Sequence, residues 1–367
     1  HGIYISTATP FPYSEPITAT ISNNIIVRNI GSGIVVEGSY DGSGFTINVT
    51  GNYIADNSSG SGGGIYVYDG GPTVNVRYNR IHNNNATDGS ALYIRDESSS
   101  GLDTYEYNTI TGGTGTSLIY KGYGTPTIRN NNFVHKSETY LVYDNRYVGE
   151  NATFDFENNW WGTTDTTNLD ALIYDWNDDP TKEQVDFTPF LTSPDTTAPP
   201  SPPTNVAAQT GPTTIALTWD SNPESDITGY KVHYDTDAAG YPYATSTDVG
   251  NNTSHTLSSL NTGTTYYTAV SAYDSDGNES WVSNEVSDST LTGTPTSLTF
   301  QTQPGNGTAG SALTTQPVVA IHVEDGGQSS SATNPVTLSI TSGTGASGAT
   351  LVGTATVDAV NGLATFS

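Results

Sequence analysis

The chain has 367 residues, enough for two or three domains, and its 37 acidic residues against 10 basic ones give a formal net charge of −27. Such an acidic surface repels phosphate backbones and anionic lipids, which argues against nucleic-acid binding and a membrane-surface role. No apolar run is long enough to span a membrane, which argues against membrane insertion. The sequence contains no Cys, which excludes disulfides, zinc–thiolate sites and thiol catalysis. Abundant Gly, Asn, Thr and Ser, with no helical periodicity, predict short strands joined by tight turns.

A short repeat runs through the first half of the chain: an Asn, any residue, then a large apolar residue. Two more strand-like runs lie in each interval, one with a small first residue, as in Gly33-Ile34, and one such as Phe45–Val49. Three short strands per repeat indicate a solenoid whose stacked coils share one core. We expect the repeated Asn amides to form a hydrogen-bonded ladder along one edge. The ladder residues are Asn23, Asn52, Asn79, Asn108, Asn131 and Asn158.

Strand parity predicts a contact surface on the strands that begin with the small residue. Because side chains alternate between the two faces of a strand, the residue between two inward ones points outward. The outward residues predicted for this sheet are aromatic or aliphatic: Tyr4, Val35, Tyr66, Tyr93, Ile119 and Val142. A contiguous apolar stripe is typical of a contact surface. The alternative is that these residues only stabilise the sheet by cross-strand pairing.

Aromatic residues mark the end of the solenoid. The run Asn158–Thr163 (Asn-Asn-Trp-Trp-Gly-Thr) and the segment Phe187–Leu191 provide side chains that can cover the last coil. These repeats resemble the right-handed parallel β-helix of the pectate-lyase-like superfamily, as found in bacterial and archaeal surface proteins. The resemblance implies a β-helix with a closing coil over residues 1–192. That scaffold carries lyases, hydrolases, adhesins and stalks, so it implies a fold and no reaction.

Two β-sandwich domains are expected after the solenoid, which makes the whole chain all-β. Residues 193–203 form a Pro-rich linker, expected to be semi-rigid and to hold its neighbours apart. Residues 204–292 resemble a fibronectin type III domain, with the core strand Leu217–Trp219, the strand Gly229–Tyr234 and a tyrosine corner at Tyr266.

Residues 293–367 resemble an incomplete bacterial immunoglobulin-like domain. The resemblance lies in strand-like alternation such as Ser297–Phe300, in Gln303-Pro304 and in the turn Asn361-Gly362. The chain also begins in mid-coil, since Gly2–Ile5 matches a small-residue strand, and it ends on a strand. We therefore expect either a longer parent chain or a neighbouring subunit that covers the open ends by head-to-tail contact.

No catalytic residues are predicted. The pair Asp178 and Asp179 lies in the closing segment, not on a repeated sheet, and the Gly-His-Gly and Arg-x-Lys signatures of pectin hydrolases are missing. His82 and His135 follow ladder Asn residues closely and are expected in turns. Arg80 is expected to point outward without an obvious acidic partner. These features favour a protein that is not an enzyme.

Calcium is the one cofactor that the sequence raises. Asp274, Asp276, Asn278 and Glu279 lie in an oxygen-rich loop with a central Gly277. The loop falls where a fibronectin type III domain needs its last hairpin, and Asp, Gly and Asn are common turn residues. A plain turn is therefore the alternative interpretation.

Together these features predict an extracellular or cell-surface structural or adhesive protein. Its partner would be further copies of itself, assembled laterally or head to tail into a fibre, tube or sheath. One alternative is a carbohydrate-binding adhesin in which Tyr66 and Tyr93 stack on sugar rings. The other is an accessory part of a polysaccharide lyase or glycosidase.

Overall fold

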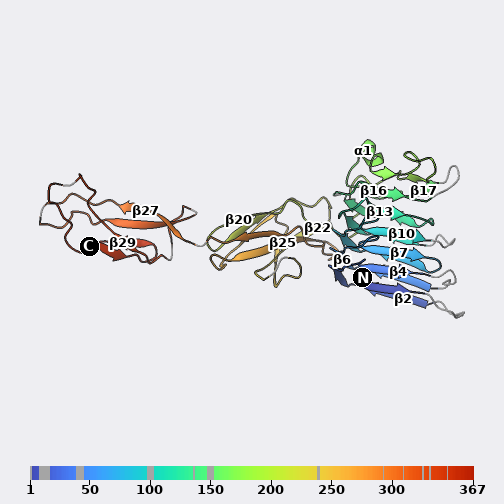
Figure 1. Cartoon of the computed structure of the whole chain (residues 1–367), viewed down its shortest axis with the longest axis horizontal. Coiled ribbons are helices and arrows are strands. Elements are labelled where there is room, and N and C mark those ends of the chain that lie inside the picture. Colours follow the sequence, from blue (N-terminus) through green and yellow to red (C-terminus); the bar gives the residue numbers. More distant parts are fainter. Residues whose placement is uncertain are drawn as a thin grey trace.

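Strands make up nearly all the regular structure of the protein. The computed structural model describes residues 2–7, 17–38, 45–96, 103–134, 137–146, 153–237, 240–291, 293–308, 310–324, 326–329, 332–344 and 346–367. Within these ranges a solenoid is followed by two sandwich-like units (Figure 1). The expected all-β class and the solenoid are therefore confirmed.

The solenoid consists of three parallel sheets, each built from one strand per coil. Sheet A contains β1 (Ile3–Ser6), β4 (Ile34–Glu37), β7 (Ile65–Asp69), β10 (Leu92–Asp96), β13 (Ser117–Lys121), β16 (Tyr140–Asp144) and β18 (Ile173–Tyr174). Sheet B contains β2 (Ile17–Ser22), β5 (Phe45–Thr50), β8 (Thr73–Arg77), β11 (Thr104–Glu106) and β14 (Thr127–Arg129). Sheet C contains β3 (Ile25–Val27), β6 (Tyr53–Ala55), β9 (Arg80–His82), β12 (Thr109–Thr111) and β15 (Asn132–Val134).

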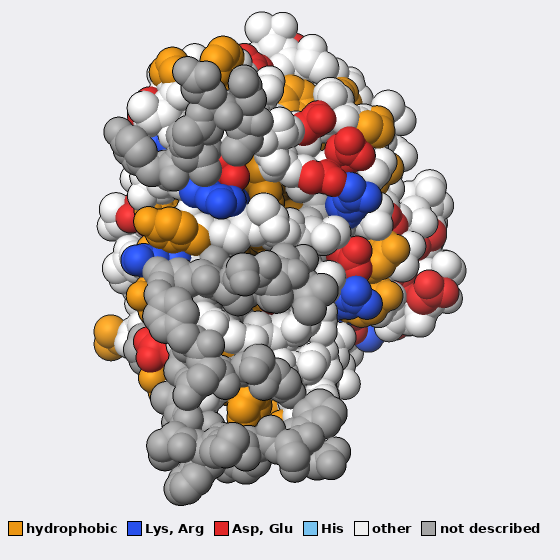
Figure 2. Space-filling view, turned by 90° about the vertical axis from the view of Figure 1, so that its right-hand side faces the viewer, with side chains coloured by type: hydrophobic (Ala, Val, Ile, Leu, Met, Phe, Trp, Pro, Cys, Tyr) orange, Lys and Arg blue, Asp and Glu red, His pale blue; other side chains and the backbone are white. Residues whose placement is uncertain are grey.

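The outer face of sheet B is polar and charged. Asn75 donates to the Asn48 side chain at 3.0 Å, and Arg77 forms an ion pair with Glu106 at 2.8 Å. Figure 2 shows the end of the molecule away from the sandwich units, where basic side chains lie directly beside acidic ones. Exposed pairs of this kind add little stability, about 0–1 kcal/mol each.

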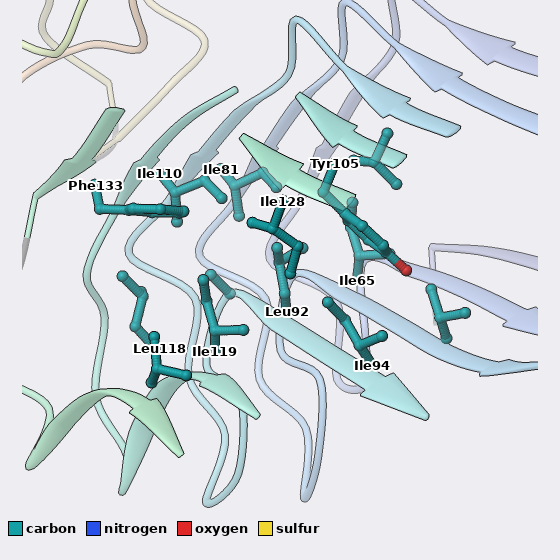
Figure 3. Close-up of a cluster of buried hydrophobic side chains, with 14 of the residues drawn as sticks. Ile65, Ile81, Leu92, Ile94, Tyr105, Ile110, Leu118, Ile119, Ile128 and Phe133 are labelled. Carbon is teal, nitrogen blue, oxygen red and sulfur yellow. The ribbon is translucent and has the colours of Figure 1, made fainter. Parts of the chain in front are cut away.

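One apolar core runs through the stack of coils. Ile65 from sheet A, Ile81 from sheet C and Ile128 from sheet B are all fully buried in it. Figure 3 shows such side chains from the three sheets pointing toward one another inside the coil. Each coil supplies one layer, so removing a layer also exposes the layers above and below it.

A ladder of buried Asn side chains runs along the bend between sheets B and C. The Oδ1 atom of Asn79 accepts from the backbone N–H and the side chain of Asn52, both at 3.0 Å. Asn79 in turn donates to Asn108 at 3.0 Å, and Asn108 donates to Asn131 at 2.9 Å. The ladder therefore satisfies backbone and side-chain groups that the bend buries.

The two ends of this ladder differ from the prediction by one residue. Asn24 and Asn159 make the ladder hydrogen bonds, with Asn52 and Asn131 respectively, so assigning Asn23 and Asn158 to the ladder was wrong. Those two residues instead precede the ladder position and have φ values of 56° and 57°. Asn tolerates this left-handed conformation better than most residues, which is why Asn-Asn pairs occur here.

A second Asn ladder, which was not predicted, lies at the next bend of three successive coils. Asn29 donates to Asn57 at 2.7 Å, and Asn57 donates to Asn84 at 3.0 Å. In the following coil Gly113 is located close to Asn84, and its N–H donates to the buried Glu138 carboxylate at 2.5 Å. The carboxylate thus takes over the role of an amide where this ladder ends.

Aromatic packing closes the last coil. Trp161 is buried, with its ring centroid 4.9 Å from that of Phe133. Beyond it, β17 (Thr153–Asp155) pairs with β19 (Gln184–Asp186), and the helix α1 (Thr166–Asp170) is capped by the Asp165 side chain. The tryptophan next in sequence, Trp160, lies in the outer column of sheet C, so only one of the pair enters the core.

The first sandwich has two antiparallel sheets. One contains β20 (Ala207–Thr210), β21 (Ile215–Thr218) and β24 (Ser254–Leu257), and the other β22 (Ile227–Asp235), β23 (Thr245–Gly250), β25 (Thr265–Asp274) and β26 (Val286–Ser289). Trp219 is buried against Tyr230, with ring centroids 5.6 Å apart. The hydroxyl of Tyr266 accepts from the backbone N–H of Asn261 at 3.0 Å, which is the tyrosine corner that the sequence predicts.

The last sandwich-like unit leaves apolar side chains of one strand exposed. It contains β27 (Pro295–Thr302), β28 (Val318–Val323) and β31 (Leu363–Thr365) in one sheet and β29 (Pro335–Thr337) with β30 (Thr356–Asp358) in another. Its core includes Ile321 and Phe366, whereas Leu298 and Phe300 on β27 are exposed. The predicted turn is present, since Asn361 and Gly362 have φ values of 50° and 76°.

The Pro-rich segment does not hold its neighbours apart as expected. The first sandwich packs against the side of the solenoid, at sheet C and near β6, instead of continuing along the axis of the stack (Figure 1). The segment itself lies on sheet C, where the Asp195 N–H donates to Asn132 at 2.7 Å and the Pro199 carbonyl accepts from Thr109. The Pro-rich segment therefore packs on the solenoid beside the first sandwich and does not hold the two domains apart.

Candidate functional site

The outer face of sheet A carries a stack of tyrosine rings. Tyr93 lies 4.8 Å from Tyr66 and 4.6 Å from Tyr120, measured between ring centroids, and the Tyr120 stack continues through Tyr143 to Tyr174. Parallel strand pairing sets these side chains one coil apart on the same face. One outer column, in register, is Tyr4, Val35, Tyr66, Tyr93, Tyr120, Tyr143 and Tyr174. Val35 lies in this column as predicted but is only 2% exposed.

The prediction that Ile119 and Val142 belong to this outer column was wrong. Both are buried, and Ile119 pairs in register with Leu92 and Val142, which point into the core. Figure 3 shows Ile119 inside the coil beside Leu118. The prediction placed Ser117 at the position of Ala91, but Leu118 occupies that position, and a shift of one residue turns every side chain to the other face.

The stack presents ring edges and hydroxyl groups, not ring faces. Both faces of Tyr93 are covered, because Tyr66 and Tyr120 lie parallel to it within 17° and 4°. Burial in the stack raises the pKa of Tyr120 to about 12, so its hydroxyl is protonated at neutral pH. Stacking on sugar needs an open ring face, so the predicted role of Tyr93 in sugar stacking is not supported by this geometry, and one face of Tyr66 is covered by Tyr93.

The outer face of sheet C is the surface on which the Pro-rich segment and the first sandwich dock. Its column comprises Ile25, Tyr53, Arg80, Thr109, Asn132 and Trp160. The Tyr53 hydroxyl donates to the Glu279 carbonyl at 2.9 Å, and Arg80 Nε donates to the same oxygen at 2.6 Å. Trp281 of the first sandwich packs over Tyr53 with ring centroids 5.5 Å apart.

Arg80 therefore has a partner that the sequence did not reveal. It is only 8% exposed, stacks over the Tyr53 ring at 4.8 Å and has a pKa lowered by burial. The Glu279 carboxylate lies over the face of the β22–β25 sheet opposite the sandwich core, where it contacts Lys231 at 2.6 Å and Ser271 at 2.6 Å. Although burial alone would raise its pKa, hydrogen bonds from His233, Lys231 and Ser271 lower the pKa of Glu279 to about 2.

Two clefts open where the solenoid meets the first sandwich. The larger has a volume of about 660 Å³ and lies between His82 and Thr111 of sheet C and Asn205, Asn222 and Glu285 of the sandwich. The smaller has a volume of about 290 Å³. It combines aromatic walls with charged groups: Tyr53, Tyr241, Tyr243, Trp281, Lys231, His233 and Glu279.

Of the proposed calcium ligands, Asp274 and Asn278 are in direct contact, with the Asn278 side chain donating to Asp274 at 2.9 Å. One oxygen of Asp274 accepts from the N–H groups of Asp276 and Asn278, at 3.0 and 2.7 Å, and Glu279 turns away from the loop. Among the described residues no group of three His, Cys, Asp or Glu is placed to hold a metal ion. In this structure Asp274 closes the loop by hydrogen bonds, as the acidic residue of a turn does.

The candidate catalytic residues of the solenoid half are also accounted for by local structure. Asp179 accepts from the N–H and hydroxyl of Thr181, at 3.0 and 2.8 Å, and these bonds lower its pKa, while Asp178 is exposed beside it. His82 lies in strand β9, not in a turn as expected, and its ring hydrogen-bonds with Thr111. His135 lies outside the described residues.

A charged cluster that was not predicted lies inside the solenoid. Lys121 and Asp144 end strands β13 and β16, are fully buried, and pair in register. The only sequence signal is the position of Lys121, which pairs with the core residue Ile94 and so points inward.

Two family models match the chain. The model of the right handed beta helix region matches residues 1–160, and that of the fibronectin type III domain matches residues 201–289. With the stacked coils and the sandwich described above, these matches show a right-handed β-helix followed by a fibronectin type III domain. No curated protein matches the sequence.

Similar solved structures match about a quarter of the chain. The chicken CNTN1 FN1–FN3 domains are 26% identical over 25% of this chain, with a TM-score of 0.24, and the match spans 33% of that structure. An Fn3-like protein from Clostridium thermocellum is 33% identical over 24% of this chain and 92% of its own, with a TM-score of 0.23.

The two matched domains fit an extracellular surface or adhesion-type protein. Beta-helix regions are also often linked to polysaccharide-active enzymes. Within the described residues, no helix is long and apolar enough to cross a membrane.

Proposed function

We propose that this chain is an extracellular structural or adhesive protein whose solenoid assembles with further copies of itself into a fibre, tube or sheath. The observation that carries the proposal is the outer column of sheet A, which contains no charged residue from Tyr4 to Tyr174. In a chain with 37 acidic and 10 basic residues, an uncharged stripe is where two copies approach with the least repulsion. Sheet C is already covered by the first sandwich, which leaves sheet A as the favoured contact.

The test replaces Tyr93 and Tyr120 with Asp and compares association with that of the wild-type protein. The matched control is the pair Tyr78→Asp and Tyr107→Asp, which stacks at 5.5 Å with an angle of 8° but lies outside sheet A. Sedimentation velocity over a concentration series and electron microscopy should show assemblies for the wild type and the control only. A wild-type protein that stays monomeric at every concentration, or a Tyr93/Tyr120 variant that assembles normally, would refute the proposal.

The second candidate function is carbohydrate binding, and the smaller junction cleft favours it. Tyr53, Tyr241, Tyr243 and Trp281 provide aromatic walls beside the ion-paired Glu279, the combination of apolar and polar groups that sugar rings require. Calorimetric titration with a panel of neutral and acidic oligosaccharides tests this function. Binding that is lost in Tyr241→Ala and kept in Tyr93→Ala supports the cleft, whereas no binding across the panel rejects it.

We further propose that the protein does not cleave polysaccharides. Asp178 and Asp179 are the only consecutive Asp residues in the solenoid half of the sequence. They lie in a turn of the closing segment, and Asp179 accepts hydrogen bonds from Thr181. Incubation with neutral and acidic polysaccharides and added calcium should give no new reducing ends or unsaturated products. Turnover that disappears in Asp178→Asn or Asp179→Asn would show that the protein is an enzyme.

A further inference from the structure

A lysine lies in the core of the solenoid in direct contact with two carboxylates. Lys121 Nζ forms an ion pair with Glu183 Oε2 and lies 3.4 Å from Asp144 Oδ1. Arg146 holds the other Glu183 oxygen at 2.9 Å. The side chains of Lys121 and Asp144 are 0% exposed and that of Glu183 is 2% exposed, so the three charged groups are out of contact with bulk water.

An ion pair alone does not explain why this position holds charge. The same inward position is Ile5, Val36, Val67 and Ile94 in the preceding coils. A buried ion pair is seldom more stable than well-packed apolar side chains, because both charges must be removed from water. In this coil the Lys–Asp pair therefore takes the place of an apolar layer whose burial would cost less free energy.

The surroundings of Asp144 suit an acyl acceptor. Its Oδ2 accepts from the Glu183 N–H at 3.0 Å and its Oδ1 from the Arg146 N–H at 3.4 Å. Two N–H groups aimed at one carboxyl group stabilise negative charge that develops on its oxygens when a nucleophile adds. Burial raises the pKa of Asp144, which favours the protonated form that can be attacked.

Lys121 is equally well placed as a nucleophile. Its Nζ lies 4.4 Å from the centroid of the Phe154 ring, on an apolar wall of the core. An amine attacks only when it is neutral, and Glu183 is in contact with Nζ to accept the proton. Register pairing of β13 with β16 fixes the two side chains beside each other, so no loop motion is needed.

We propose that Lys121 and Asp144 condense spontaneously to an amide that links adjacent coils, with Glu183 as the acid–base catalyst. One proton of the Lys121 ammonium passes through Glu183 to the Asp144 carboxylate, which leaves an amine and a carboxylic acid. The nitrogen lone pair adds to Cγ of Asp144. Glu183 then moves a second proton from the nitrogen to the departing hydroxyl oxygen, the C–O bond breaks and one water leaves. No atom is oxidised or reduced, and Glu183 returns to its original state beside Arg146.

The bond would remove two buried charges and leave the Glu183–Arg146 pair balanced. It would also join β13 to β16 where the solenoid ends, so that these two coils could not separate by pulling. This inference is independent of the proposed assembly through sheet A, because it concerns the interior of one chain.

The first measurement is the intact mass of the purified wild-type protein under denaturing conditions. We expect a mass lower by one water than the sequence requires. Trypsin should fail to cut after Lys121, which gives a branched product in which peptide 96–129 is joined to peptide 137–146. The full sequence mass, or a branch that joins Lys121 to Glu183, would overturn the proposal.

Two variants test whether Glu183 catalyses the condensation or whether contact between Lys121 and Asp144 is enough. Glu183→Gln keeps the shape of the side chain and should have its full calculated mass, while Asp144→Asn should still form the amide and lose ammonia instead of water. Circular dichroism shows whether each variant keeps its strands. A folded Glu183→Gln protein that still loses one water would refute the catalytic role of Glu183, and that result does not depend on the Asp144 variant.

Discussion

Replacing Asn79 with Ala in the centre of the first ladder should destabilise the solenoid by about 4 kcal/mol. Asn79 is fully buried and its side chain donates to the carbonyls of Val49 and Arg77, at 2.8 and 3.0 Å, as well as to Asn108. Its oxygen accepts from Asn52 twice. The substitution leaves at least two buried backbone groups unsatisfied, the Val49 carbonyl and the Asn52 N–H, at about 1–3 kcal/mol each.

The assay is urea unfolding of the full chain, with hydrogen exchange of the Asn52 amide as a local readout. The matched control is Asn24→Ala at the exposed end of the same ladder, where Asn24 donates to Ser22 at 3.0 Å and to Asn52 at 3.1 Å. Water can replace those bonds, so the control should lose less than about 1 kcal/mol. Equal losses for the two variants, or an unchanged exchange rate at Asn52, would refute the ladder argument.

Two further predictions concern the first sandwich and the second ladder. Bonds with His233, Lys231 and Ser271 lower the pKa of Glu279 to about 2, from a usual value of 4.5. The ionised carboxylate therefore stabilises the first sandwich above pH 4.5, and this stability is lost as the pH falls from 4.5 toward 2. Urea midpoints measured across that range should fall for the wild type and flatten for Glu279→Gln, and parallel curves would contradict the assignment. Gly113→Ala should destabilise the solenoid by about 3 kcal/mol, because its Cβ would lie 1.6 Å from the Asn84 carbonyl oxygen. Gly60→Ala, with nothing within 4 Å of the added carbon, is the control, and similar melting temperatures for the two variants would contradict the prediction.

Local repetition made the solenoid predictable from the sequence. Asn52, Asn79, Asn108 and Asn131 recur once per coil, and the apolar residue two positions later is buried in each case. The positions of the ladder Asn and of the buried apolar residue are fixed by their spacing within one coil. Each repeat therefore shows the same pattern independently of the others. The first sandwich was also predictable from local sequence, because Trp219 and Tyr266 lie in short motifs.

Register was decided by the tertiary structure wherever the sequence offered two adjacent candidates. Asn23-Asn24 and Asn158-Asn159 each place one Asn in the left-handed bend and the next in the ladder, and spacing alone cannot distinguish them. In the outer column of sheet A, the replacement of a small residue by Leu118 hid a shift of one position. Only the hydrogen bonds between coils fix which residue faces the core.

Contacts between distant segments were decided by the tertiary structure alone. Arg80 and Glu279 are far apart in sequence and meet because the first sandwich docks on sheet C. Lys121, Asp144 and Glu183 come from three different coils and converge because those coils stack in register. The sequence determined the stacked β-helix and the fold of the first sandwich through local periodicity and motifs. The side-on docking, the tyrosine column and the buried lysine depended on packing between segments, which no local pattern encodes.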